Sequence, residues 1–166
     1  MKRLTLKEML ENKVKLNEVI KTVKGTKAIE DTIKEAIKLD IPICVYGKEC
    51  TGKTMILRAV LDIVPLFNSS ENGDNLDIGE IEKEVLKGNI KYFTVHEAVI
   101  EQLKEKYSDR GLRKNIVLIK CKQDSNGVKY IENVTELITV DGKTDEIELV
   151  NIVKQKYNKI SKVEAL

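Results

Sequence analysis

Gly47-Lys48-Glu49-Cys50-Thr51-Gly52-Lys53-Thr54 matches the pattern G-x-x-x-x-G-K-[ST] of a phosphate-binding loop at every fixed position. The apolar segment 41–46 before it indicates a buried strand, and residues 55–64 after it indicate a helix. The two glycines allow the backbone N–H groups to converge on one point, and the helix adds its positive N-terminal end. A chance glycine-rich turn is the alternative, but the flanking strand and helix favour a site for a nucleoside triphosphate.

The pattern also assigns roles to single residues of the loop. Lys53 is expected to reach the β- and γ-phosphates, and the hydroxyl of Thr54 is expected to ligate Mg²⁺. We expect ATP with Mg²⁺ as the ligand, bound by all residues from Gly47 to Met55. The pattern does not distinguish ATP from GTP, and it does not say what the binding serves.

Composition sets the limits of the interpretation. The chain has 166 residues, of which 42% are hydrophobic and 34% charged, so we expect one compact globular domain with a real core. A net charge of +2 gives no direct signal for nucleic acid or membrane. The three cysteines have no metal-binding spacing, and neither a signal-peptide pattern nor an apolar run of about 18 residues is present. We therefore expect a cytoplasmic protein.

The rest of the chain alternates helical and strand patterns. Residues 1–40 indicate a helical lead-in segment, with an apolar stripe on a helix over 26–39. Residues 41–166 form the expected P-loop domain, with strands at 90–95, 115–122 and 128–140 and helices at 77–87 and 97–107. Segment 68–75 indicates an exposed loop, 124–127 a hairpin turn, and 146–160 a terminal strand or helix. This order predicts an α/β three-layer sandwich with a mainly parallel sheet and a C-terminal antiparallel hairpin.

Four segments, taken in this order, resemble the secretion and pilus ATPase family, which includes the type II and type IV secretion motors and their conjugation relatives. Leu4-Thr-Leu-Lys-Glu-Met-Leu10 resembles the lead into the motor domain, and residues 42–65 resemble its phosphate-loop strand and helix. Thr94-Val95-His96 resembles the histidine box of that family, and residues 115–136 resemble its late β-hairpin. The resemblance implies a RecA-like ATPase domain that acts as a hexameric ring or with other subunits of a secretion machine.

Two motifs depart from the family pattern. The acidic box expected after the phosphate-loop helix has no clear match. The second carboxylate motif fits at Ile78-Gly79-Glu80-Ile81, but Glu82 stands where an arginine is expected, and the strand before it is thin. The chain therefore resembles a minimised relative with weakened hydrolysis.

Three residues besides Lys53 are candidates for the chemistry. The resemblance implies that Glu80 orients water or ligates Mg²⁺, although its spacing from Asp77 also fits a simple helix-capping box. It implies that His96, the sole histidine, senses the γ-phosphate or contacts a subunit interface, with a structural role at a strand end as the alternative. Glu97 is a rival carboxylate, or an ordinary first-turn glutamate. Because ligands bind beyond the carboxyl ends of parallel strands, we expect His96 and one of the glutamates beside the loop.

Two other classes of function compete with a motor-type ATPase. A non-catalytic nucleotide-binding regulatory or assembly subunit fits the missing acidic box. A small-molecule kinase fits less well, because a kinase needs an arginine-rich lid over the phosphates and this chain has four arginines in all. We expect an ATP-binding domain with slow hydrolysis.

Overall fold

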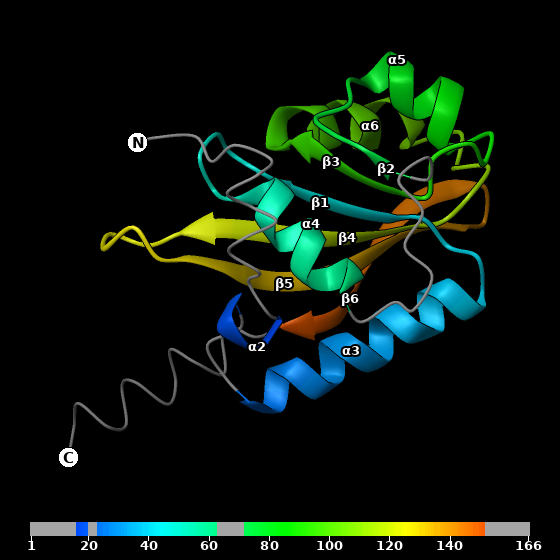
Figure 1. Cartoon of the computed structure of the whole chain (residues 1–166). Coiled ribbons are helices and arrows are strands. Elements are labelled where there is room, and N and C mark those ends of the chain that lie inside the picture. Colours follow the sequence, from blue (N-terminus) through cyan, green and yellow to red (C-terminus); the bar gives the residue numbers. More distant parts are fainter. Residues whose placement is uncertain (1–15, 20–22, 63–71, 152–166) are drawn as a thin grey trace, which may run out of the picture.

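The computed structural model describes residues 16–19, 23–62 and 72–151, which form a sheet with helices on both faces (Figure 1). The helices are α2 (Leu16–Val19), α3 (Val23–Lys38), α4 (Lys53–Leu61), α5 (Ile78–Glu80), the π-helical turn η2 (Ile81–Val85) and α6 (Glu97–Tyr107). The strands are β1 (Ile43–Gly47), β2 (Asn72–Gly73), β3 (Tyr92–His96), β4 (Ile116–Gln123), β5 (Lys129–Val140) and β6 (Lys143–Asn151).

The six strands lie in the order β2-β3-β1-β4-β5-β6. Strand β1 pairs in parallel with both β3 and β4, and β2 pairs in parallel with β3. Strand β5 pairs in the antiparallel sense with both β4 and β6. The parallel strands therefore end at one common edge, and the phosphate-loop sequence begins at this edge, directly after β1.

The two faces of β1 belong to two separate hydrophobic clusters. Ile43 and Val45 pack with α2, α3 and α4 on one face, and Cys44 and Tyr46 pack with α5, η2 and α6 on the other. Alternate side chains of a strand point to opposite faces, so a strand with helices on both faces is apolar throughout. All five residues of β1 are buried for this reason.

Most of the expected elements are confirmed. The α/β fold with parallel central strands and an antiparallel hairpin near the C-terminus is present. Helix α3 covers the expected amphipathic helix, with Ile29 and Ile33 fully buried, and α6 has the expected bounds. Part of the terminal segment 146–160 is strand β6. The predicted features at residues 1–15, 63–71 and 152–166 lie outside the described residues.

Two expectations are wrong. The segment 68–75 was expected to be a loop, but residues 72 and 73 form strand β2, which pairs with the first two residues of β3. The apolar strand that the resemblance implies before Glu80 is also missing, because α5 and η2 occupy residues 78–85, in agreement with the helix predicted over 77–87. Both errors arise where a short polar segment gains its structure from a neighbouring strand or a capping side chain instead of from hydrophobic pattern.

Among the described residues, none of the helices is both long enough and apolar enough to cross a bilayer.

Candidate functional site

The phosphate-loop segment adopts a tight turn between β1 and α4. Gly52 takes a left-handed conformation with φ +76° and caps the N-terminus of α4, while Cys50 takes φ +61°. The hydroxyl of Thr51 donates to the carbonyl oxygen of Lys48 at 2.8 Å and closes the turn from inside. Left-handed backbone costs a non-glycine residue roughly 1–2 kcal/mol, so the conformation at Cys50 is held by the surrounding loop.

The β4–β5 hairpin supports the loop from one side. A Cβ atom at Gly47 would lie 2.8 Å from the carbonyl oxygen of Cys121 in β4 and 2.7 Å from the hydroxyl of Thr51. A Cβ atom at Gly52 would lie 2.7 Å from Cδ of Lys129, at the start of β5. At Gly47 the backbone of β4 approaches too closely for a side chain, whereas at Gly52 the positive φ and the overlying stem of Lys129 both favour glycine.

Lys53 folds back over the loop. Its ammonium donates to the carbonyl oxygens of Gly47 at 3.3 Å and Lys48 at 3.1 Å. Burial raises the pKa of the Cys121 thiol above its usual range, and the positive charge of Lys53 acts in the opposite direction. The side chain of Lys53 is partly exposed, so it is held over the loop without being part of the core.

The carboxylate that contacts the loop helix is Asp74, which directly follows β2. Its Oδ1 atom accepts hydrogen bonds from the hydroxyls of Thr54 at 3.1 Å and Thr94 at 2.6 Å. Thr94 lies in β3, is fully buried, and accepts in turn from the backbone N–H of Asn75 at 2.7 Å. These bonds join α4, β2 and β3 at the carboxyl edge of the parallel strands.

Sequence reasoning missed Asp74 because its surroundings are polar. It stands in the segment Asn72-Gly73-Asp74-Asn75, which has the composition of a turn. The two-residue strand β2 forms only by pairing with Tyr92 and Phe93 of β3. P-loop proteins place a carboxylate from a neighbouring strand beside the threonine of the loop. Testing every acidic residue after Thr54 for this role would have included Asp74.

His96 lies where the sequence predicted it, at the carboxyl end of β3 and opposite Gly47 in the strand register. Its Nδ1 atom accepts a hydrogen bond from the backbone N–H of Ala98 at 3.1 Å and so caps α6. A neutral imidazole that accepts at Nδ1 carries its proton on Nε2, which is therefore a hydrogen-bond donor. His96 thus has a structural role, the capping of α6, which was the alternative in the sequence analysis. Its Nε2–H group is not used for this cap.

The two candidate glutamates have other partners. Glu80 and Asp77 form a reciprocal capping box, with bonds of 2.8 Å and 3.3 Å between side chains and backbone N–H groups. Glu97, the first residue of α6, lies 3.9 Å from the ammonium of Lys120 in β4. The catalytic and metal-binding roles expected for Glu80 stay predictions, but the contact with Thr54 is made by Asp74.

The oxygen atoms beside the loop suit a hard divalent cation. The described residues contain no group of three or more His, Cys, Asp or Glu side chains that could hold a metal ion by themselves. Mg²⁺ typically takes one or two protein oxygens and completes its shell with water and phosphate oxygens. Thr54 and Asp74, which already share a hydrogen bond, form a donor pair of this kind.

Comparison of the sequence with models of known protein families finds no match, and no curated protein matches it either.

Replacing Asp74 by alanine should lower the free energy of unfolding by about 1–3 kcal/mol, because the buried hydroxyl of Thr94 loses its acceptor. Urea denaturation followed by circular dichroism measures the change. Asp31→Ala is the matched control, since Asp31 forms an exposed ion pair with Lys27 and its loss should change stability by less than about 0.5 kcal/mol. Equal stability of the two variants would contradict the role of Asp74.

Proposed function

We propose that this chain is a P-loop domain that binds a nucleoside triphosphate, with ATP as the expected nucleotide and Mg²⁺ as its counterion. The observation that carries the proposal is the contact of Thr54 with Asp74 at the carboxyl edge of parallel strands. P-loop NTPases hold Mg²⁺ between the loop hydroxyl and a carboxylate on a neighbouring strand. If the loop were a chance glycine-rich turn, no carboxylate would be expected beside Thr54, the residue that the pattern assigns to the metal.

Each residue has a defined task in this proposal. The backbone N–H groups of the loop and the N-terminus of α4 bind phosphate oxygens, and Lys53 exchanges its carbonyl partners for the β- and γ-phosphates. Thr54 and Asp74 would hold Mg²⁺, which when bound neutralises part of the phosphate charge. The Nε2–H group of His96 is a donor for the terminal phosphate at the same edge.

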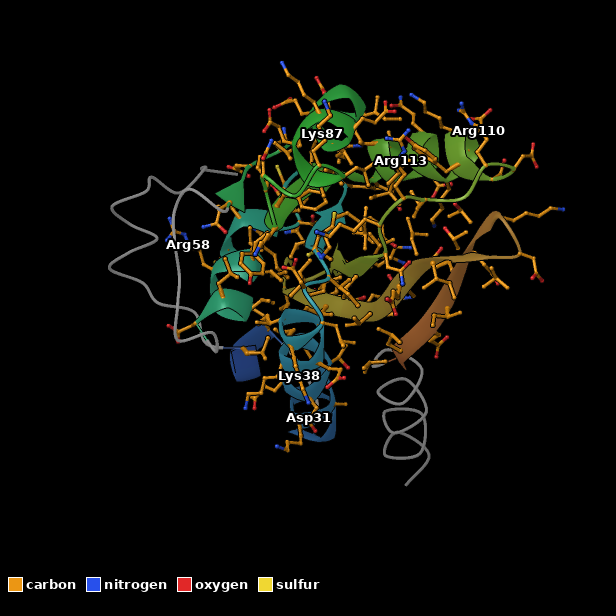
Figure 2. The ribbon with its side chains drawn as sticks, turned by 90° about the vertical axis from the view of Figure 1, so that its right-hand side faces the viewer. Asp31, Lys38, Arg58, Lys87, Arg110 and Arg113 are labelled. Carbon is orange, nitrogen blue, oxygen red and sulfur yellow. The ribbon has the colours of Figure 1, made fainter. Side chains whose placement is uncertain are left out.

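Weak hydrolysis is part of the proposal. Glu80 caps α5 and Glu97 pairs with Lys120, so both glutamates that the sequence offered for activating water already have partners. Arg110 and Arg113 precede the amino end of β4, at the opposite edge of the sheet from the loop. Figure 2, which views the molecule from that edge, shows both arginines on the α6 side. The same observations favour the second candidate function, a subunit that binds ATP without turning it over.

The wider assignment is a proposal that depends on motif resemblance. We propose a reduced, RecA-like relative of the secretion and conjugation ATPases that works in the cytoplasm, as a hexameric ring or with subunits of such a machine. The order of the phosphate loop, His96 and the late hairpin supports this assignment. The kinase alternative receives no support from the arginines at 110 and 113.

Lys53→Ala should reduce the affinity for a fluorescent ATP analogue by at least about 100-fold, because charge-assisted bonds to two phosphates are lost. The fold should stay intact, since the ammonium bonds only to loop carbonyls. Fluorescence titration measures affinity, and Lys143→Ala, at an exposed lysine on the opposite edge, is the control.

A second readout uses the native thiols. Cys50 is exposed within the loop, whereas Cys44 and Cys121 are buried and burial raises the pKa of both thiols. Bound nucleotide should slow the alkylation of Cys50 in the wild type and leave its rate unchanged in Lys53→Ala. Equal affinity of wild type and Lys53→Ala, without protection of Cys50, would refute the proposed function.

Asp74→Asn should remove most of the gain in affinity that Mg²⁺ gives to the wild type, a gain we expect to be roughly 10-fold or more. The amide keeps an oxygen that accepts from Thr54 and Thr94 but loses the charge that attracts the cation. Titrations with Mg²⁺ and with a chelator measure the gain. Glu80→Gln is the discriminating control, because the loss of the Mg²⁺ effect in that variant instead would assign the metal to Glu80.

The isolated chain should hydrolyse ATP slowly, well below about 1 s⁻¹, the lower end of ordinary enzyme turnover. An arginine supplied to the phosphates is worth about 10³–10⁵ in rate, and Arg110 and Arg113 lie away from the loop. Phosphate release should be followed on a sample shown to be monomeric by light scattering. Turnover of several per second by the monomer would contradict this expectation.

A further inference from the structure

Lys129 lies against the phosphate loop although it is distant from it in sequence. It is the first residue of β5 and pairs with Gln123, at the point where the β4–β5 hairpin extends past the loop (Figure 1). Strand alternation puts Lys129 on the same face as Ile131, which packs in the cluster beneath α4. A Cβ atom at Gly52 would lie 2.7 Å from Cδ of Lys129, and the ammonium is only two bonds further along the side chain.

We propose that Lys129 supplies a second ammonium group, besides that of Lys53, to the phosphates of a nucleotide bound by the loop. This inference rests on the proposed function of the loop and adds a binding residue that the phosphate-loop pattern does not contain. The apolar stem of Lys129 packs on Gly52. Long lysine side chains commonly lay their stems on a surface in this way and keep the charged end in water.

The charge of Lys129 is available for this task. Within the described ranges, Lys104, Lys106 and Lys122 pair with glutamates, whereas none of the ion pairs found there includes Lys129. A flexible ammonium acts as a point charge that suits phosphate oxygens without requiring a fixed bidentate geometry.

Lys129 would give the loop a second cation without a neighbouring subunit. Arg110 and Arg113 lie at the opposite edge of the sheet, and Arg3 lies outside the described residues. Lys129 belongs to the same chain as the loop and is fixed to it by the hairpin. Its contribution is therefore expected in the monomer.

The test compares affinities for a fluorescent ATP analogue in the presence of Mg²⁺. Lys129→Met keeps an unbranched stem over Gly52 and removes the charge, and it should weaken binding roughly 10- to 100-fold, as for one charge-assisted hydrogen bond. Lys129→Arg should bind within about 3-fold of the wild type, because the charge is kept. Lys143→Met, which removes an exposed lysine at the far edge of the sheet, should leave the affinity unchanged. Circular dichroism of each variant should give the spectrum of the wild type.

Three outcomes overturn the inference, and they are distinguishable. If Lys53→Ala abolishes binding but Lys129→Met binds like the wild type, the loop is a nucleotide site and Lys129 has no part in it. If Lys143→Met weakens binding as much as Lys129→Met, the effect is one of net charge. If the wild type itself binds no triphosphate, the proposed function falls and the role of Lys129 falls with it.

Discussion

A single carboxylate oxygen links three elements at the carboxyl edge of the parallel strands. Oδ1 of Asp74 accepts from Thr54 at the start of α4 and from Thr94 inside β3, and Asp74 itself follows β2. Because Thr94 is fully buried, its hydroxyl needs this acceptor, and an unmet buried donor would cost about 1–3 kcal/mol. The need of the buried Thr94 hydroxyl for an acceptor therefore fixes the position of the Asp74 carboxylate. In this position the carboxylate also faces the hydroxyl of Thr54.

The loop conformation depends equally on the β4–β5 hairpin. Gly47 lies so near the carbonyl of Cys121 that a side chain would require the backbone of β4 to move, and Gly52 is covered by the stem of Lys129. Position 52 favours glycine because of its own positive φ, whereas position 47 favours glycine because another strand packs against it. The loop and the hairpin are thus one packing unit, although more than sixty residues separate them in the chain.

The parts of the structure that were predictable carry strong local signals. Strand β1, helix α6 and the hairpin turn at Asp124 follow from apolar runs, helical periodicity and turn residues, and the register of His96 with Gly47 follows from parallel strands that share an edge. Asp74 could not be found in this way, since β2 has two residues and no apolar pattern. Lys129 was equally hidden, because nothing local distinguishes it from other lysines at strand ends. Both residues owe their place at the loop to long-range strand pairing.

The groups around the loop carry charges of both signs. Lys53, Lys129 and the N-terminus of α4 attract an anion, but Asp74 lies at the same edge and would repel one. A bare phosphate would gain from the first three groups and lose part of that gain to the carboxylate. A divalent cation held between the phosphates and Asp74 would reverse the sign of this last interaction. The proposed metal-bound polyphosphate therefore fits these four groups better than a free anion would.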